Sequence, residues 1–291
     1  MTTDSEIPVR VTRDLALAQE WELVLVAQGL SPSVHQTSDG ILLSVPEKEL
    51  ERARASLSAY ERENPAKLAE RDEPIASATP LAGILVAAML VVFFAVTVSW
   101  NPSVPWFERG SADADRILRG ELWRTVTALT LHADIVHVLS NAIAAAVFLG
   151  AVYGMSGVGL GSALVLLAGA GGNLANALLH GSSHVSVGAS TAIFASVGML
   201  GSSGMVRRRR RATPRRRAWL PVAAALALLA ILGTGGQRVD ILAHLFGFLL
   251  GGVLGILFAF VAPDPPGLGV QWLCGFTVLA LLVCCWTLAL G

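Results

Sequence analysis

Seven long apolar segments follow residue 79, and they constrain the fold of this chain more than any other feature. They lie near residues 80–100, 135–153, 157–179, 185–204, 218–235, 239–262 and 270–290. Each approaches the roughly 20 residues that a helix needs to cross the hydrocarbon core of a bilayer. The composition, with 54 % hydrophobic and only 14 % charged residues, excludes an ordinary soluble domain. The sequence therefore predicts an all-α polytopic membrane body, integral to a membrane and crossing it several times.

The residues before these segments have a different character. Residues 1–79 hold 14 acidic and 8 basic residues, a net charge of −6. Helical spacing over 14–28, short strands over 34–37 and 41–45 around an Asp39-Gly40 turn, and a charged helix over 46–60 predict a helix–strand–strand–helix order. We therefore expect a small acidic α/β domain at 1–63 and a polar linker at 64–79. No apolar signal sequence opens the chain, so this domain is expected to stay in the cytoplasm.

Eight arginines, at 207–211 and 215–217, lie between the fourth and fifth apolar segments. Such a run also occurs in proteins that bind nucleic acid, but close apolar flanks favour a cytoplasmic loop that sets membrane topology. No nucleic-acid partner is therefore expected. With this loop and the N-terminus inside, residues 101–134 lie outside. The second, fourth and sixth segments then all enter the membrane from its outer face.

These three segments carry polar groups at matching depth near the outer face. The second contains His137 and Asn141, which are four residues apart and share one helix face. The fourth contains Ser190, and the sixth contains His244. A serine hydroxyl needs an adjacent base to act as a nucleophile, and a neutral imidazole can be that base. The Asn141 amide, the His137 ring and backbone N–H groups near Ser190 could stabilise an oxyanion.

Small residues favour close approach of the fourth and sixth segments. Glycines at 247, 251 and 255 form one ridge of helical spacing, and Gly188, Ala192 and Ser196 form another. Packing of the two ridges would bring His244 toward Ser190.

The chain resembles the rhomboid family of intramembrane serine proteases over roughly residues 80–262. The matching motifs are Trp123-Arg124, the His137…Asn141 pair, Gly188-Ala189-Ser190 and Ala243-His244…Gly247. The resemblance implies a six-helix core at 80–262 and a seventh, additional C-terminal transmembrane helix at 263–291. It also implies that Ser190 is the nucleophile, His244 the general base, and His137 and Asn141 oxyanion ligands. Phe194 matches an aromatic position beneath the catalytic histidine, and Trp123-Arg124 match a structural motif of the outer loop.

Three features do not follow this pattern directly. Thr191 occupies a place where the family usually has glycine, and its β-branched side chain could narrow the site or tilt the loop. Asp240, one turn before His244, could orient the imidazole or lie at the watery start of its helix. His180 and His184 are four residues apart, but no further metal ligands are obvious, so a loop face is expected there.

We therefore expect an intramembrane serine endopeptidase that cuts membrane-anchored proteins near the outer face, without a metal or other cofactor. The expected partners are transmembrane or membrane-anchored substrates and the lipid bilayer, and a cytoplasmic partner of the N-terminal domain stays open. The expected location is the bacterial cytoplasmic (inner) membrane with the N-terminus inside. One alternative is a catalytically inactive rhomboid-like protein that binds or escorts membrane clients. A transporter that uses the intramembrane histidines is a second alternative, although the inner halves of the segments offer few polar residues.

Overall fold

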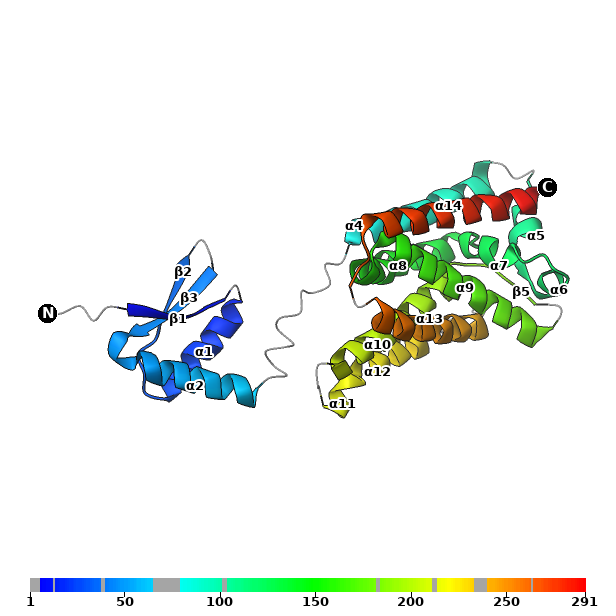
Figure 1. Cartoon of the computed structure of the whole chain (residues 1–291). Helices are drawn as coiled ribbons and strands as arrows, with labels where there is room; N and C mark the ends of the chain where they lie inside the picture. Colours follow the sequence, from blue (N-terminus) through cyan, green and yellow to red (C-terminus); the bar gives the residue numbers. More distant parts are fainter. Residues whose placement is uncertain are drawn as a thin grey trace. The chain divides into compact units, whose positions relative to one another are not determined.

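The chain divides into two compact units, Met1–Glu73 and Pro74–Gly291 (Figure 1). The computed structural model describes residues 6–12, 14–37, 40–64, 79–100, 104–181, 184–210, 214–232, 240–262 and 264–291. Asp39 of the predicted turn and residues 65–78 of the predicted linker lie outside these residues, as do Arg211 and residues 233–239. Most of the described chain is helical, with one small sheet in the N-terminal unit.

The N-terminal unit is a three-stranded antiparallel sheet with two helices. Its elements are β1 (Glu6–Thr12), α1 (Leu15–Ala27), β2 (Ser33–Thr37), β3 (Gly40–Pro46), the 3-10 turn η1 (Glu47–Glu49) and α2 (Leu50–Glu63). The strand order is β1-β3-β2, with β3 in the centre. The predicted helix–strand–strand–helix order therefore missed β1. Ile7, Val9 and Val11 do alternate in this edge strand, but Pro8 interrupts the run and only Val9 is buried. Backbone pairing with β3 completes the strand.

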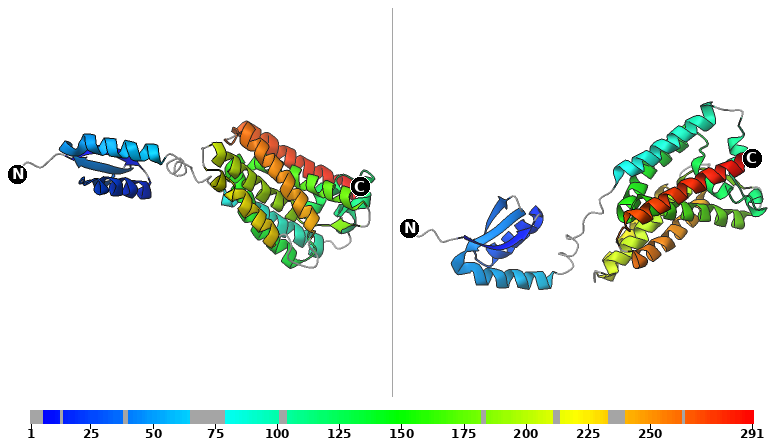
Figure 2. Two further views of the ribbon diagram at one scale, coloured as in Figure 1. Left: turned by 90° about the horizontal axis from the view of Figure 1, so that it is seen from below. Right: turned by 45° about the horizontal axis from the view of Figure 1, so that its top comes forward.

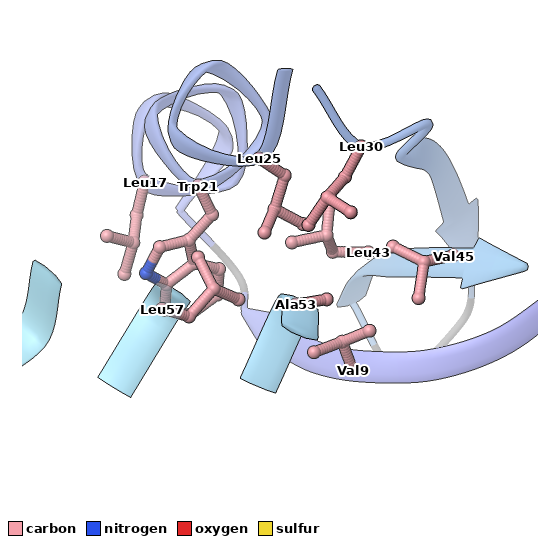
Figure 3. Close-up of a cluster of buried hydrophobic side chains, with 9 residues drawn as sticks. All are labelled: Val9, Leu17, Trp21, Leu25, Leu30, Leu43, Val45, Ala53 and Leu57. Atoms are coloured by element: carbon pink, nitrogen blue, oxygen red, sulfur yellow. The ribbon is translucent and has the colours of Figure 1, made fainter. Parts of the chain in front are cut away.

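Nine buried side chains from both helices, two strands and the loop after α1 form the core of this unit (Figure 3). They are Val9, Leu17, Trp21, Leu25, Leu30, Leu43, Val45, Ala53 and Leu57. Removing such side chains from water is the main favourable term in folding, so the apolar face of each helix is directed toward the sheet.

The second unit is built from long helices (Figure 2). They are α4 (Pro80–Ala95), extended by the π-helical turn η2 (Val96–Trp100), α8 (Ile135–Ser156), α9 (Val158–His180), α10 (Ser190–Arg210), α12 (Leu220–Leu232), α13 (Ile241–Val261) and α14 (Leu268–Leu290). Short elements join them: α5 (Trp106–Gly110), β4 (Ala112–Asp113), α6 (Ala114–Leu118), α7 (Arg124–Thr127), η3 (Ala128–Thr130), β5 (Val185–Ser186) and α11 (Arg215–Ala218).

Five of these helices are long and apolar enough to cross a membrane, within the described residues. They span Pro80–Val98, Ile135–Ser156, Val158–His180, Ile241–Val261 and Leu268–Leu290. The sequence predicted seven such segments. The other two differ for physical reasons, because α10 ends in four arginines and the described part of α12 has only 13 residues.

The fourth apolar segment was expected to be helical from its start, but its first residues are not helical. Val185 and Ser186 form the short strand β5, which pairs with β4, and α10 begins only at Ser190. Gly188 has a φ of +129°, a conformation that side chains disfavour and that interrupts the helix. Ser190 therefore lies at the N-terminus of a helix.

The glycine ridge of α13 packs directly on the backbone of α10. A Cβ atom on Gly247, Gly251 or Gly255 would overlap the carbonyl oxygen of Thr191, Ala195 or Met199, respectively. Small residues at this spacing let two helix backbones approach closely.

The predicted partner ridge on the fourth segment was wrong. Gly188 precedes α10, and Ala192 faces α9, where a Cβ on Gly169 would lie 2.9 Å from the Ala192 Cβ. Because α10 starts later than predicted, the face toward α13 instead contains Thr191 and Ala195.

The far end of α10 carries arginines stacked on aromatic rings. The Arg209 guanidinium lies 5.3 Å from the centroid of Trp219, and that of Arg210 lies 4.9 Å from the centroid of Phe260 at the end of α13. Cation–π contacts of this kind hold a charged group beside an apolar surface. The two ends of α10 thus differ sharply in chemistry.

Candidate active site

Ser190 is the first residue of α10, and two backbone hydrogen bonds fix the residues before it. The Gly188 N–H donates to the Ala128 carbonyl oxygen at 2.9 Å. The Ala189 N–H donates to Nε2 of His132 at 3.3 Å, and His132 is fully buried. The position of the serine is therefore set by Ala128 and His132, which precede α8, as well as by its own helix.

His244 lies in the first turn of α13, and its Nε2 is 2.8 Å from the Ser190 hydroxyl oxygen. The imidazole is buried, with 6 % of its surface exposed. The Phe194 ring lies one turn along α10, with its centroid 4.5 Å from that of the imidazole. The close approach at Gly247 brings the two helix backbones near enough for this contact. A hydroxyl within hydrogen-bond reach of a neutral imidazole nitrogen is the geometry of an activated nucleophile.

His137 and Asn141 lie on α8 and face the glycine that precedes the serine segment. A Cβ on Gly188 would lie 2.6 Å from His137 Nε2 and 3.5 Å from Asn141 Nδ2, so only glycine fits there. Asn141 is buried, and its Nδ2 has no hydrogen-bond acceptor among the described residues. A buried amide donor normally has a partner, so one without is suited to an oxygen that the reaction supplies.

Thr191, at the position where the family usually has glycine, packs its methyl group between α9 and α13. A Cβ atom added to Gly172 of α9 would lie 2.7 Å from the Thr191 Cγ2, and one added to Gly247 of α13 would lie 3.1 Å from it. The β-branched side chain therefore occupies room that two glycines leave open between the helices.

The Trp123-Arg124 motif holds together the segment of residues 104–134 that precedes α8. Arg124 is 1 % exposed and donates to the carbonyl oxygens of Glu108 and Ser111 at 2.9 and 3.0 Å and to the Glu121 carboxylate at 2.6 Å. Trp123 caps α7, and its carbonyl oxygen accepts the Thr127 N–H. These bonds lie in this segment and not among the groups around Ser190.

A polar cluster at the N-terminal end of α13 was not predicted from the sequence. Asp240 caps this helix by accepting the Ala243 N–H at 3.0 Å. Its other carboxylate oxygen lies 2.7 Å from His184 Nε2 and 2.6 Å from Asn176 Nδ2. From the sequence, Asp240 was expected to orient His244 or to lie at the start of its helix, and His184 was expected on a loop face, so the contact between the two was not predicted. The capping position before an apolar run was the one available signal.

Two groups near the site and outside the spanning helices have shifted pKa values. Burial, together with the nearby His137, lowers the pKa of His132 to about 4, against a backbone hydrogen bond at Thr130 that raises it. Burial raises the pKa of Asp240, but hydrogen bonds from His184, Ala243 and Asn176 outweigh it and hold the pKa below its usual value. His132 is therefore neutral and Asp240 charged at neutral pH.

The geometry defines a multi-pass membrane protein with a serine hydroxyl and an imidazole in contact between two closely packed helices. The Rhomboid domain family model matches residues 119–260. A Bacillus subtilis (strain 168) protein named "Putative rhomboid protease YdcA" is 30 % identical over 173 residues, covering 57 % of this chain and 81 % of its own. The Arabidopsis thaliana "RHOMBOID-like protein 1" is 32 % identical over 163 residues, covering 51 % of this chain and 38 % of its own.

The chain belongs to the rhomboid family, as the motifs predicted. Rhomboids are generally intramembrane serine proteases. The matched region contains every residue that the sequence analysis selected for the site, from Trp123 to Gly247.

Proposed function

We propose that this protein is an intramembrane serine endopeptidase that hydrolyses peptide bonds of membrane-anchored proteins, with Ser190 as nucleophile and His244 as general base. The observation that carries the proposal is the 2.8 Å distance between Ser190 Oγ and His244 Nε2. The buried imidazole, with Phe194 beneath it, has little freedom to leave this position.

In the first half of the reaction, His244 Nε2 takes the Ser190 proton as Oγ forms a bond to the scissile carbonyl carbon. The carbonyl oxygen becomes an oxyanion, and the C–N bond then breaks as the imidazolium returns the proton to the leaving amine. In the second half, a water molecule gives its proton to His244 and attacks the acyl-enzyme ester. Collapse of this intermediate releases the carboxyl product and restores the Ser190 hydroxyl.

The oxyanion would be held by donors from two helices. Asn141 supplies an Nδ2–H group without an acceptor among the described residues, and the His137 ring lies beside the same glycine. The first backbone N–H groups of a helix have no partner within it, and its N-terminus carries partial positive charge. The start of α10 at Ser190 thus favours negative charge next to the nucleophile.

We further infer a six-helix core made of α4, α8, α9, α10, α12 and α13, with α14 as an additional helix. The arginines at the end of α10 favour the cytoplasmic side, so Ser190 would lie near the outer face. This orientation leaves the acidic N-terminal domain inside, and a bacterial cytoplasmic membrane would fit it. The substrate helix must unwind locally, because its carbonyl groups are otherwise occupied by hydrogen bonds.

The test is cleavage of a model transmembrane substrate, together with labelling by a fluorophosphonate probe, by the purified protein in liposomes. Ser190→Ala and His244→Ala should each reduce cleavage by at least about a thousandfold, because both members of the pair act in the same step. Each variant should still insert and unfold at a temperature close to that of the wild type. Undiminished cleavage by the Ser190→Ala protein would sink the proposal. A wild-type protein that binds the substrate but is never labelled would instead favour an inactive client-binding protein.

A further inference from the structure

A cluster of three polar side chains joins three separate elements at the outer end of the second unit. Asp240 caps α13, Asn176 lies on α9, and His184 precedes β5. The Asp240 carboxylate lies 2.7 Å from His184 Nε2 and 2.6 Å from Asn176 Nδ2, which is also 3.2 Å from that ring nitrogen. The side chains of His184 and Asp240 are 27 % and 15 % exposed, so the contact is largely shielded from water.

Two of these residues lie on the segments that carry the reacting groups. His184 precedes Ser190 by six positions through β5, and Asp240 precedes His244 by one helical turn. A small pocket is lined by both Ser190 and Asp240, together with Ser186, Gly188 and Ala243. The bond between His184 and Asp240 therefore links the approach to the nucleophile with the start of the helix that carries the base.

His184 itself is held in place by its surroundings. Its carbonyl oxygen accepts the Ala114 N–H at 2.9 Å, and β5 pairs with β4 directly after it. The His180 ring stacks on the His184 ring with centroids 3.9 Å apart. His180 Nδ1 lies 3.0 Å from the Asn176 carbonyl oxygen instead of contacting the carboxylate. Within the described residues, no three such side chains are grouped as metal ligands would be.

We propose that His184 and Asp240 are positioning residues that align Ser190 Oγ with His244 Nε2, an inference that rests on the proposed protease function. The glycine ridge fixes α10 against α13, but residues 184–189, which lead into α10, are not helical. A fixed point is needed where that segment passes the start of α13, and the charged Asp240 carboxylate supplies it. A misplacement of about 1 Å in such a site can cost about a hundredfold in rate.

The experiment measures the rate of Ser190 labelling by a fluorophosphonate, and kcat and KM on a model transmembrane substrate, with the full chain in liposomes. His184→Leu removes the donor but keeps apolar bulk, and it should slow labelling and lower kcat by about 10- to 100-fold. KM should change by less than about twofold, because the substrate-binding surface is intact. His184→Gln keeps a donor at similar reach and should recover labelling to within about threefold of the wild type. His180→Phe, which keeps a ring stacked on His184 but removes the neighbouring imidazole nitrogens, should stay within about twofold.

A double variant separates a specific contact from general loosening. Asp240→Asn keeps an oxygen to cap α13 but removes the charged acceptor. If both residues act through one bond, the double variant His184→Leu/Asp240→Asn should be no slower than the slower single variant. The proposal would be overturned if the losses of labelling rate in the two single variants multiply in the double variant. It would also be overturned if His184→Leu is labelled at the wild-type rate, or if His184→Leu and His184→Gln lose the same fraction of the rate. Cleavage of the model substrate and labelling by the wild type, both absent in Ser190→Ala, test the protease function in the same assay, so failure of that function is recognised separately.

Discussion

α13 and α14 are both apolar helices of more than twenty residues, yet they are attached to the protein in different ways. In an apolar 18-residue stretch of each helix, 39 % of the stretch is buried in α13 but only 11 % in α14. α13 meets α10 through glycines that leave no room for a Cβ atom. α14 has one such backbone contact, at Gly159 against Gln271, and is otherwise attached by individual side chains near its two ends. The packing of α13 on α10 therefore positions the two site residues, whereas the packing of α14 only attaches that helix to the others.

The side chains that attach α14 to its neighbours are polar at one end and aromatic at the other. At one end, Gln271 accepts the Leu160 N–H at 3.0 Å and donates to the Ser156 carbonyl oxygen at 2.9 Å. At the other end, Trp286 donates to Thr130 Oγ1 at 3.2 Å, and its ring lies 5.2 Å from that of Trp106. In a bilayer, lipid tails are as apolar as side chains, so close packing and hydrogen bonds must hold helices together. α13 relies mainly on close packing, and α14 combines close contact near Gly159 with discrete bonds.

The largest expected effect comes from a single methyl group on the ridge. Gly251→Ala would place its Cβ against the Ala195 carbonyl oxygen, so α13 must move away from α10 and carry His244 with it. We expect Ser190 labelling by a fluorophosphonate to slow by at least about a hundredfold. The matched control is Gly269→Ala on α14, where no atom lies within 4 Å of the new Cβ. Equal labelling rates in the two variants would remove the distinction between the helices.

Acid should loosen the site before it loosens α14, because of His132. Its pKa is about 4 in the folded protein against about 6.5 in an unfolded chain, so the unfolded state binds the extra proton between these values. This contribution to stability is complete above pH 6.5 and is lost as the pH falls toward 4, on the order of 3 kcal/mol in all.

Thermal unfolding in detergent at pH 7 and pH 5 measures this loss. His132→Gln keeps an acceptor for the Ala189 N–H but cannot be protonated, so its stability should change less between the two pH values. A variant that follows the wild type in both conditions would contradict the assignment.

The bonds of α14 should matter for stability more than for catalysis. Gln271→Leu removes both hydrogen bonds to the region around residues 156–160, and we expect a loss of about 1–2 kcal/mol in the free energy of unfolding. Ser190 labelling should stay within about twofold, since Gln271 contacts the end of α9 opposite to His184. Trp272→Phe, an exposed aromatic exchange on the same helix, is the control. A fall in the Ser190 labelling rate of clearly more than about twofold would show that α14 is coupled to the site.

The smallest effect is expected at Thr191. Thr191→Ser keeps the hydroxyl and removes the methyl group that occupies the space beside Gly172. Loss of one buried methyl group should cost about 1 kcal/mol or less, with cleavage unchanged within about twofold. Cleavage of the model substrate and thermal unfolding together test this, and a strong change in cleavage would mean that the threonine acts on the site itself.

The sequence was sufficient for the parts of the fold that depend on local composition. Apolar runs located the long helices, and motif spacing predicted the family, which the comparisons confirm. The spacing of Gly247, Gly251 and Gly255 also indicated a packing face on α13. These signals succeed because each is contained within one segment of the chain.

The missed features depend on contacts between distant segments. β1 is completed by its pairing with β3, because Pro8 interrupts its short alternation of Ile7, Val9 and Val11 and only Val9 is buried. The bond between His184 and Asp240 joins residues 56 positions apart across α10 and α12. The start of α10 at Ser190 depends on the backbone of Gly188, which an uninterrupted apolar run does not reveal. In each case a long-range contact or a backbone angle decides the structure.

The chemistry at the two ends of α10 has a consequence for where a substrate is cut. The helix has 21 residues, so at its usual rise the hydroxyl of Ser190 and the arginines at the far end are about 30 Å apart. If the arginines are held at one headgroup layer, the length of α10 sets the depth of Ser190 in the bilayer and so the depth at which a peptide bond is cut. One inserted residue would shift that depth by about 1.5 Å and turn the serine by about 100° away from its base. A thicker bilayer would draw the serine below the opposite headgroup layer, so bilayer thickness would select which bond of a substrate is reached.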